Sequence, residues 1–296
     1  MTTRLKPVPS HQQHDRIRQL LAREDLYHGS IKTKTLAGGL WNDAVRVDAG
    51  EQRYVFKTYC EVPEDSFFPN SAEGEANALK RLAGLDISPE FVALWPEENL
   101  LAYKYVDGNI WNGDVAAVAR LLVRKEACEP TGFQLGKLTP HELLAEGDQI
   151  FAKCRYAKPP ARPIPVEIEP PERLSMIHRD VGPNNLVGSN KELRLIDWQC
   201  PTAGDSAEDI YSFLAPAFHI VGGREPLSDE ERSCFFQVLD LPASKQRYEL
   251  LASYFSWRMA AYCSWRSETH EDGEIRERYR KAALAEFEFI YRSQNT

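Results

Sequence analysis

Residues 176–187 read MIHRDVGPNNLV, a stretch that places one histidine, one arginine, one aspartate and two asparagines between two short apolar runs. Two interpretations are open. Asp and Asn side chains often make hydrogen bonds to nearby backbone in polar turns, so the stretch could be a surface turn. The same groups could instead form a catalytic loop. The rest of the chain has to decide between the two.

The spacing of the polar residues favours a catalytic loop. His178, Asp180 and Asn185 form H-x-D-x-x-x-x-N, and Asp197 follows at the end of the next apolar run. A carboxylate and an amide on one loop, with a second carboxylate nearby, can position a hydroxyl and bind magnesium, which prefers oxygen ligands. Phosphoryl transfer needs such groups because its catalysis is mainly positioning and charge neutralisation.

A lysine and a glutamate upstream match the same chemistry. Lys57 lies at an inward position of the predicted strand RYVFKTY, where a buried ammonium needs an anionic partner. Glu75 in EANAL is the preferred partner and Glu73 its rival, since Glu75 shares a helical face with Leu79 and Leu82. The ordinary alternative is a strand-edge lysine in water.

A glycine pair marks the first predicted turn. Gly38 and Gly39 lie in LAGGLWNDAVRV, where the missing side chains would let backbone amides approach phosphate oxygens. By itself such a pair usually forms only a hairpin turn.

The first hundred residues predict a compact α+β lobe. A short amphipathic helix over 14–26 precedes three antiparallel strands within 31–59, and a helix follows with Ser71 as its N-cap and Gly84 as its stop. Two strands joined by Pro-Glu-Glu-Asn are expected within 90–108. The lobe therefore has about five strands and one main helix.

The remaining chain predicts a mainly helical lobe. Helical patterns cover 113–126, 139–154 and most of 207–292, while the proline-rich stretch 159–171 must be irregular. Two short β-like runs flank the 176–187 stretch. We place the N-terminal lobe at 1–106 and the C-terminal lobe at 107–296.

Composition excludes several classes of function. The chain has 296 residues and a formal net charge of −8, which argues against a general binder of nucleic acid or of anionic membranes. Its six cysteines form no CxxC pair, so neither a zinc site nor a disulfide framework is indicated. We find no signal peptide and no apolar run long enough to span a bilayer, and expect a cytoplasmic protein.

The order of these motifs resembles a known family. The Gly-Gly turn, VFK, EANAL, HRDVGPNN and LIDW follow one another as in the protein-kinase-like superfamily, and are most similar to the aminoglycoside phosphotransferase and choline/ethanolamine kinase group. The resemblance extends from about Leu36 to Tyr211. It implies an α+β, two-lobed fold with a five-stranded antiparallel sheet and one main helix in the N-terminal lobe, and a mainly helical C-terminal lobe.

The resemblance also implies roles for individual residues. Asp180 would orient and deprotonate the acceptor hydroxyl, Lys57 and Glu75 would serve the ATP phosphates, and Asn185 and Asp197 would bind Mg²⁺. The nucleotide would be contacted by the glycine turn and by a hinge whose backbone binds adenine. These nucleotide-binding residues are Gly38, Gly39, Asn42, Lys57, Tyr103, Lys104 and Val106.

Several departures from protein kinases indicate a small-molecule substrate. Gly182 replaces the lysine that meets the transferred phosphate in Ser/Thr kinases, and Trp-Gln follows Asp197 where those enzymes have Phe-Gly. No activation segment ending in A-P-E is present. Asp209 is expected to fasten the catalytic loop, and His178 and Arg179 to hold it. Lys125 stands where many aminoglycoside relatives carry a histidine, and Arg179 where Gly or Asn is commoner.

The acceptor is expected to be small and cationic. Aromatic residues in YFSWRMAAYCSWR could hold an ammonium group by cation–π attraction, or could simply face the core. The candidate substrate residues are Trp198, Trp257 and Trp265.

The predicted function is ATP-dependent transfer of the γ-phosphate to a hydroxyl of a choline- or ethanolamine-like metabolite. Alternatives are an aminoglycoside O-phosphotransferase, a kinase for a sugar or a homoserine-like amino-alcohol, and a kinase-fold binding protein without turnover. An aminoglycoside would call for acidic helices, and SETHEDGEIRE supplies acids that could equally form a solvated charge run.

Overall fold

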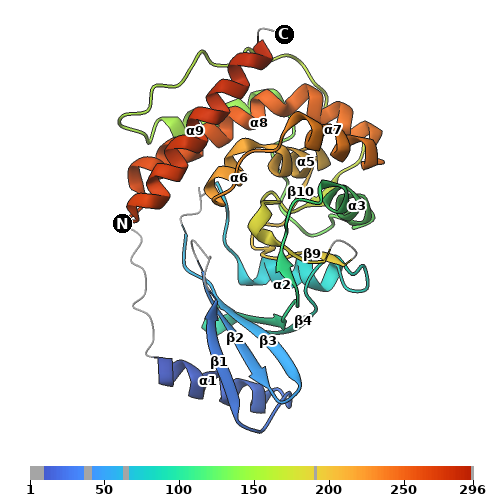
Figure 1. Ribbon diagram of the computed structural model, residues 1–296, viewed down its shortest axis with the longest axis vertical. Helices are drawn as coiled ribbons and strands as arrows, with labels where there is room; N and C mark the ends of the chain where they lie inside the picture. The colour runs from blue at the N-terminus through green and yellow to red at the C-terminus, as the bar shows by residue number, and fades with distance from the viewer. Residues whose placement is uncertain (1–9, 37–41, 63–66, 190–191, 295–296) are drawn as a thin grey trace. The chain divides into compact units, whose positions relative to one another are not determined.

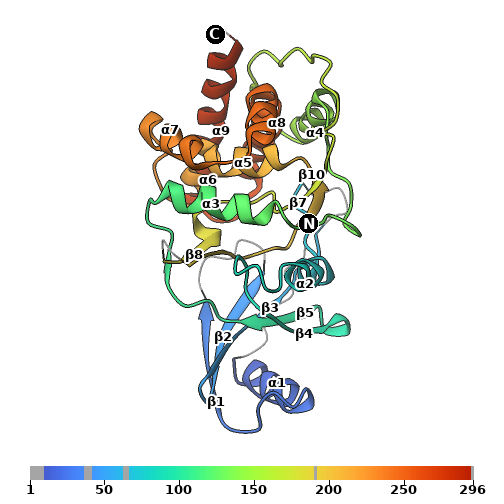
Figure 2. The same cartoon turned by 90° about the vertical axis from the view of Figure 1, so that its right-hand side faces the viewer.

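The computed structural model describes residues 10–36, 42–62, 67–189 and 192–294, and divides into two compact units. The first unit comprises residues 1–109 and 194–200, and the second comprises 110–193 and 201–296. The predicted lobes, 1–106 and 107–296, differ from these units chiefly in 194–200, which here join the first unit. Figures 1 and 2 show the elements of each unit.

The first unit is built on a five-stranded antiparallel sheet. Its strand order is β1-β2-β3-β5-β4, so β3 lies in the middle with β2 and β5 on either side. The elements are α1 (Ser10–Arg23), β1 (Ile31–Leu36), β2 (Asp43–Ala49), β3 (Gln52–Thr58), α2 (Ala72–Arg81), β4 (Phe91–Trp95), η1 (Pro96–Glu98) and β5 (Leu100–Lys104). The predicted strands, and the predicted helix between β3 and β4, are confirmed.

Local signals fix the two helices of this unit. The Ser71 side chain accepts a hydrogen bond from Gly74 N and so caps α2, as predicted. Helix α1 buries Ile17, Leu20 and Leu21 against the sheet. This burial explains why apolar residues recur along one face of the helix.

The second unit is mainly helical, and within it α8 and α9 lie side by side (Figure 1). Its elements are α3 (Val115–Lys125), α4 (Pro140–Phe151), β7 (Ser175–Ile177), η2 (Pro183–Asn185), β8 (Leu186–Gly188), β10 (Thr202–Gly204), α5 (Ser206–Leu214), α6 (Pro216–Val221), α7 (Asp229–Val238), α8 (Pro242–Thr269) and α9 (Gly273–Gln294). Two short strands, β6 (Asn109–Ile110) and β9 (Leu193–Leu195), lie where the chain passes between the units. In the described ranges, none of the helices is long and apolar enough to cross a membrane. The predicted α+β fold class is confirmed.

One strand pair in the second unit positions the 176–187 stretch. Strand β7 ends at Ile177, inside this stretch and just before His178, and it pairs with β10, with Ile177 opposite Thr202. Helix α5 begins directly after β10. Helix α5 then packs against β7, and its residue Asp209 meets the backbone of His178 and Arg179.

A buried glutamate on α9 predicts a pH-dependent stability. Glu286 is completely buried and accepts hydrogen bonds from Tyr211 Oη, Ser256 Oγ and Ala217 N. Burial raises its pKa to about 7, because desolvation disfavours the carboxylate. The folded state therefore holds a proton that the unfolded state releases, and this group's stabilisation decreases as pH rises from its ordinary pKa to about 7.

We expect Glu286→Gln to remove this pH dependence. Over that pH range, the difference in free energy of unfolding between wild type and variant should change by up to about 3 kcal/mol. Urea denaturation of both proteins at several pH values measures it. Parallel curves would contradict the prediction.

Candidate active site

Lys57 lies on the central strand of the first unit with its ammonium group buried. Its side chain is 5% exposed, and Nζ lies 2.6 Å from Glu75 Oε2 and also contacts Asp197 Oδ1. Neighbouring strands cover Lys57 on both sides, since it pairs with Ala44 and Leu101 in the sheet register. The interpretation of a strand-edge lysine in water is therefore excluded.

Glu75 is the partner of Lys57, and Glu73 is exposed. The Glu75 side chain is fully buried and accepts hydrogen bonds from Lys57 Nζ, from Tyr59 Oη and, at 3.1 Å, from Trp198 N. Tyr59 was not singled out by the sequence, because nothing local distinguishes it from other strand tyrosines. Its hydroxyl gives this buried carboxylate an extra donor.

The charges of this cluster are strongly coupled. Burial by itself would lower the pKa of the Lys57 ammonium. The negative charges of Asp197 and Glu75 have a larger effect and raise this pKa well above its ordinary value. Burial raises the pKa of Glu75 against the attraction of Lys57. Lys57 therefore stays charged between two carboxylates.

Asp197 stays a predicted cation ligand. Its backbone adopts a left-handed conformation at φ +66°, and its side chain is 30% exposed, in contrast to Glu75. On the second unit, Asn185 Nδ2 donates to Asp180 O at 2.9 Å, so Oδ1 is the atom with which Asn185 can bind a cation. Carboxylate and amide oxygens are each of the ligand type that magnesium prefers.

The other predicted nucleotide contacts stay predictions. Gly38 and Gly39 lie outside the described residues. Asn42 is buried in a network of side-chain amides, in which Nδ2 donates to Gln199 Oε1 at 2.7 Å and to Asn70 Oδ1 at 2.8 Å. This network is a packing feature that the sequence did not indicate.

The predicted hinge continues β5. Tyr103 is buried and pairs with Val55, while Lys104 N donates to Glu90 O. The next amide, Tyr105 N, donates to Arg53 O. The contact of this segment with adenine stays a prediction.

In the second unit, Asp209 on α5 fastens the catalytic loop, as predicted. Its carboxylate accepts hydrogen bonds from His178 N at 3.0 Å and from Arg179 N at 2.8 Å, and lies 3.2 Å from Lys125 Nζ. Two backbone amides and one ammonium thus hold a single buried carboxylate. The position of the loop relative to α5 is determined by this contact.

Further hydrogen bonds shape the loop around Asp180. Asp180 N donates to His178 Nδ1, and Val181 N donates to Ser212 Oγ. His178 is fully buried, which agrees with its predicted structural role. Asn185 closes the loop by its contact to Asp180 O, so the H-x-D-x-x-x-x-N spacing encodes one compact turn.

Lys125 is a second buried lysine, and its loss should be destabilising. Its side chain is 1% exposed, and Nζ donates to Met176 O at 2.9 Å besides pairing with Asp209. We expect Lys125→Met to lower the free energy of unfolding by about 3 kcal/mol or more, because Asp209 would lose its buried counter-charge. Urea denaturation measures this. The exposed control Lys137→Met should change stability by less than about 0.5 kcal/mol, and equal effects would contradict the prediction.

The predicted substrate tryptophans have packing partners of their own. Trp198 is fully buried and donates from Nε1 to Leu195 O, so its ring has no surface left to contact an acceptor. Trp257 is also buried and donates to Asp148 Oδ1 at 2.9 Å. Trp265 is half-buried beside Tyr262, with ring centroids 6.1 Å apart. The aromatic stripe of α8 mainly faces the core.

Several carboxylates of the acidic run 267–277, which joins the end of α8 to the start of α9, have hydrogen-bond partners within the chain. Glu268 accepts hydrogen bonds from three successive backbone amides, at residues 155–157, and Asp272 accepts from Glu274 N and Ile275 N at the start of α9. Glu277 pairs with Arg280. These carboxylates serve local structure, as the solvated-run interpretation expects.

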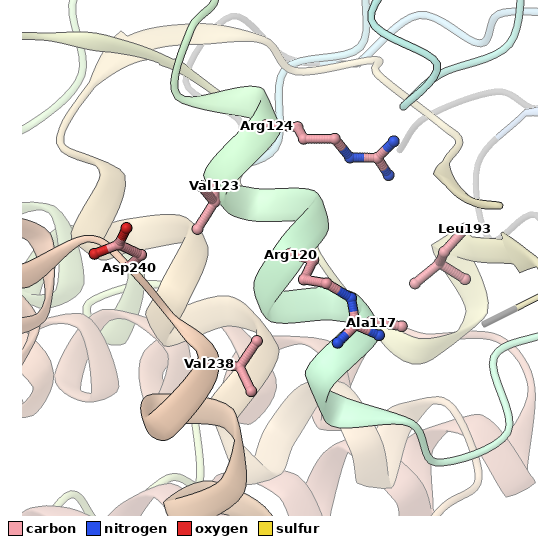
Figure 3. Close-up of a pocket in the computed structure, with 7 residues that line it drawn as sticks. All are labelled: Ala117, Arg120, Val123, Arg124, Leu193, Val238 and Asp240. Carbon is pink, nitrogen blue, oxygen red and sulfur yellow. The ribbon is translucent and has the colours of Figure 1, made fainter. Parts of the chain in front are cut away.

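A cavity of about 500 Å³ in the second unit lies elsewhere (Figure 3). Its lining comes from α3, the first residue of β9, the last residue of α7 and the segment that follows α7. The residues are Ala117, Arg120, Val123, Arg124, Leu193, Val238 and Asp240. They do not overlap with the candidate site residues.

Comparisons with known proteins agree with this geometry. The family described as "Phosphotransferase enzyme family" matches residues 32–235. Choline kinase LicA from Streptococcus pneumoniae has a similar structure, with a TM-score of 0.63 at 15% identity over 94% of this chain and 99% of that one. A choline/ethanolamine kinase family protein from Mesorhizobium loti gives a TM-score of 0.64 at 16% identity, covering 95% of each chain.

Spectinomycin phosphotransferase APH(9)-Ia, solved with ADP and spectinomycin, is similar to the same degree. Its TM-score is 0.63 at 12% identity, covering 97% of this chain and 100% of that one. At such identities these likenesses establish the fold. No curated protein sequence matches the chain.

Proposed function

Because the chain belongs to the phosphotransferase enzyme family, we propose that it transfers the γ-phosphate of ATP to a hydroxyl group of a small molecule. The observation that carries this proposal is the buried Lys57 ammonium held between Glu75 and Asp197. Burying a charged lysine is costly unless carboxylates pair with it, and a strand lysine paired with a glutamate on a helix is the arrangement with which kinases contact nucleotide phosphates. Similar proteins solved with ADP or AMP support the use of an adenine nucleotide.

The chain's own residues divide the work as follows. Lys57, oriented by Glu75, contacts the nucleotide phosphates, and Asp180 accepts the proton of the acceptor hydroxyl as it attacks. Asn185 and Asp197 would hold magnesium, which when bound neutralises charge on the transferred phosphate. His178, Asp209 and Lys125 keep the loop that carries Asp180 in one conformation, as their hydrogen bonds require.

The acceptor is proposed to be a small cationic alcohol of the choline or ethanolamine kind. A Cβ atom at Gly182 would lie 3.5 Å from Asp180 Oδ1 and 3.6 Å from Phe218 Cδ1, so the carboxylate and the aromatic ring flank the same point. An aromatic ring beside a carboxylate suits an ammonium group. The sequence did not single out Phe218, because a lone phenylalanine in a helix has no local signature.

Phe218 therefore gives a prediction about the acceptor. We expect Phe218→Ala to raise the KM for an ammonium alcohol by about 10-fold, since a cation–π contact contributes about 1–2 kcal/mol when desolvated. Phe218→Leu, which keeps apolar bulk without the π face, should raise it nearly as much. Steady-state kinetics with choline or ethanolamine measures both. If Leu restores the wild-type KM, the ring acts only by its volume.

The proposed function is tested by a phosphorylation screen. Purified protein is incubated with ATP, magnesium and a panel of ammonium alcohols, aminoglycosides, sugars and amino-alcohols, and ADP release is measured. Turnover limited to ammonium alcohols supports the proposal, and turnover with aminoglycosides alone would replace it. If no acceptor is phosphorylated and magnesium–ATP gives no thermal shift, the chain is a kinase-fold binding protein instead.

A further inference from the structure

Four charged side chains form a continuous chain of ion pairs in the second unit, which we call the buried charge chain. Arg179 Nε lies 3.0 Å from Glu208 Oε1, and Arg258 Nη2 lies 2.5 Å from the same oxygen. Arg258 Nη1 then lies 3.0 Å from Glu146 Oε2. The chain thus leads from the loop through α5 and α8 to α4.

The inner members of this chain are almost completely removed from water. The side chains of Arg179, Glu208 and Arg258 are 9%, 4% and 2% exposed. Burial by itself would raise the pKa of the Glu208 carboxyl. The guanidinium groups of Arg258 and Arg179 nevertheless hold this pKa below its ordinary value. Glu208 therefore remains charged, and its loss would leave two arginines facing one another.

Arg179 adopts a backbone conformation that costs free energy. Its φ is +69°, in the left-handed region that favours glycine. In this region the Cβ atom of a residue such as arginine lies too close to the following carbonyl oxygen. Two consecutive residues of α5 hold it at two points: Glu208 binds its side chain, and Asp209 accepts from its backbone N–H. The next residue along the chain is Asp180.

We propose that Arg179 is a positioning residue for Asp180, and that Glu208 and Arg258 transmit the position of α8 to the catalytic loop. The proposal rests on the proposed function, in which Asp180 is the proton acceptor. Both the backbone and the side chain of Arg179 are hydrogen-bonded to α5. These contacts fix the backbone conformation immediately before Asp180. A carboxylate held this way keeps its reactive geometry, and small displacements of such a group are costly for the rate.

The alternative is that these ion pairs only stabilise the fold. A second ion pair between α8 and the start of α5 provides a matched control for this alternative. Arg247 on α8 pairs with Asp205 at the start of α5, and their side chains are 17% and 3% exposed. This pair joins α8 to α5 as Arg258 joins Glu208, but Asp205 caps α5 and does not hold Arg179. Arg247→Met should therefore lower Tm without changing kcat by more than about 2-fold.

The test compares Arg179→Asn and Arg179→Lys with this control. Asn tolerates the left-handed conformation, and Glu208 keeps Arg258, so the fold should persist. We expect Arg179→Asn to lower kcat by about 10- to 100-fold with KM values for ATP and acceptor within about 2-fold, because positioning is lost and binding is not. Arg179→Lys, which can still pair with Glu208, should recover a large part of kcat.

Hydrogen–deuterium exchange gives a readout that does not depend on turnover. Arg179→Asn should increase deuterium uptake by the amides of residues 178–181, whereas Arg247→Met should not. Unchanged kcat and unchanged uptake in Arg179→Asn would overturn the proposal. If the wild type phosphorylates no acceptor, the proposed function fails, and the exchange result alone still decides whether Arg179 orders the loop.

Discussion

Replacing Asp180 by asparagine is expected to lower kcat by about 10³-fold, since a positioned general base contributes about 10² to 10⁴. Asparagine has the same shape but cannot accept the acceptor's proton. The hydrogen bond from Asn185 Nδ2 goes to the backbone oxygen of residue 180, so the loop should keep its conformation. Initial rates of ADP release at saturating ATP and acceptor measure the loss.

Binding of the nucleotide separates this effect from unfolding. The KM for ATP and the thermal shift caused by magnesium–ATP should stay near wild-type values, because Lys57 and Glu75 are untouched. Asp240→Asn, which changes an exposed aspartate in the same unit, is the control and should keep full activity. Normal turnover in Asp180→Asn would show that another group accepts the proton.

Replacing Lys57 by methionine should lower kcat by about 10²-fold or more, the loss typical for removing one preorganised electrostatic contact. The KM for ATP should also rise, because the ammonium is proposed to contact the phosphates in the ground state as well. The substitution leaves Glu75 and Asp197 without the cation between them. Because burial already raises the pKa of Glu75, this carboxyl should take up a proton in the variant.

Lys34→Met provides the matched control for this substitution. Lys34 lies on β1 of the same sheet and is exposed, so its loss should leave kcat and KM unchanged. Circular dichroism melting of both variants shows how much of the Lys57→Met effect is unfolding. A Lys57→Met protein with wild-type kinetics would exclude Lys57 from the site.

Much of the fold and of the candidate site follows from local sequence. Strands β1 to β5, the Ser71 cap of α2 and the irregular proline segment follow from alternation, capping and missing donors, which act within a few residues. The resemblance to aminoglycoside phosphotransferases and choline kinases, and the expectation of a phosphotransferase, are confirmed by the family match. The order of the motifs was enough to indicate the family, because each motif is a short segment that can be read from the sequence without knowing the fold.

Aromatic residues show where such patterns stop being informative. Tyr254, Trp257, Tyr262 and Trp265 recur at helical spacing, and this spacing fits both a substrate cage and a buried helix face. Burial favours the buried helix face over the substrate cage, since Tyr254, Trp257 and Tyr262 are each at most 5% exposed. Trp198 is likewise inside the core of its unit, although it follows a predicted metal ligand.

The MIHRDVGPNNLV stretch itself determined that a carboxylate and an amide share one compact loop, because their spacing is local. Asp209 and Glu75 were expected from the motifs, but only the tertiary structure showed that Lys125 and Glu208 also hold the loop and that Asp197 is a second partner of Lys57. Glu208 and Asp209 lie 29 and 30 residues from Arg179 along the chain, and Lys57 lies 140 residues from Asp197. Contacts of this kind depend on which charged groups the fold buries together, and burial is a property of the packed chain.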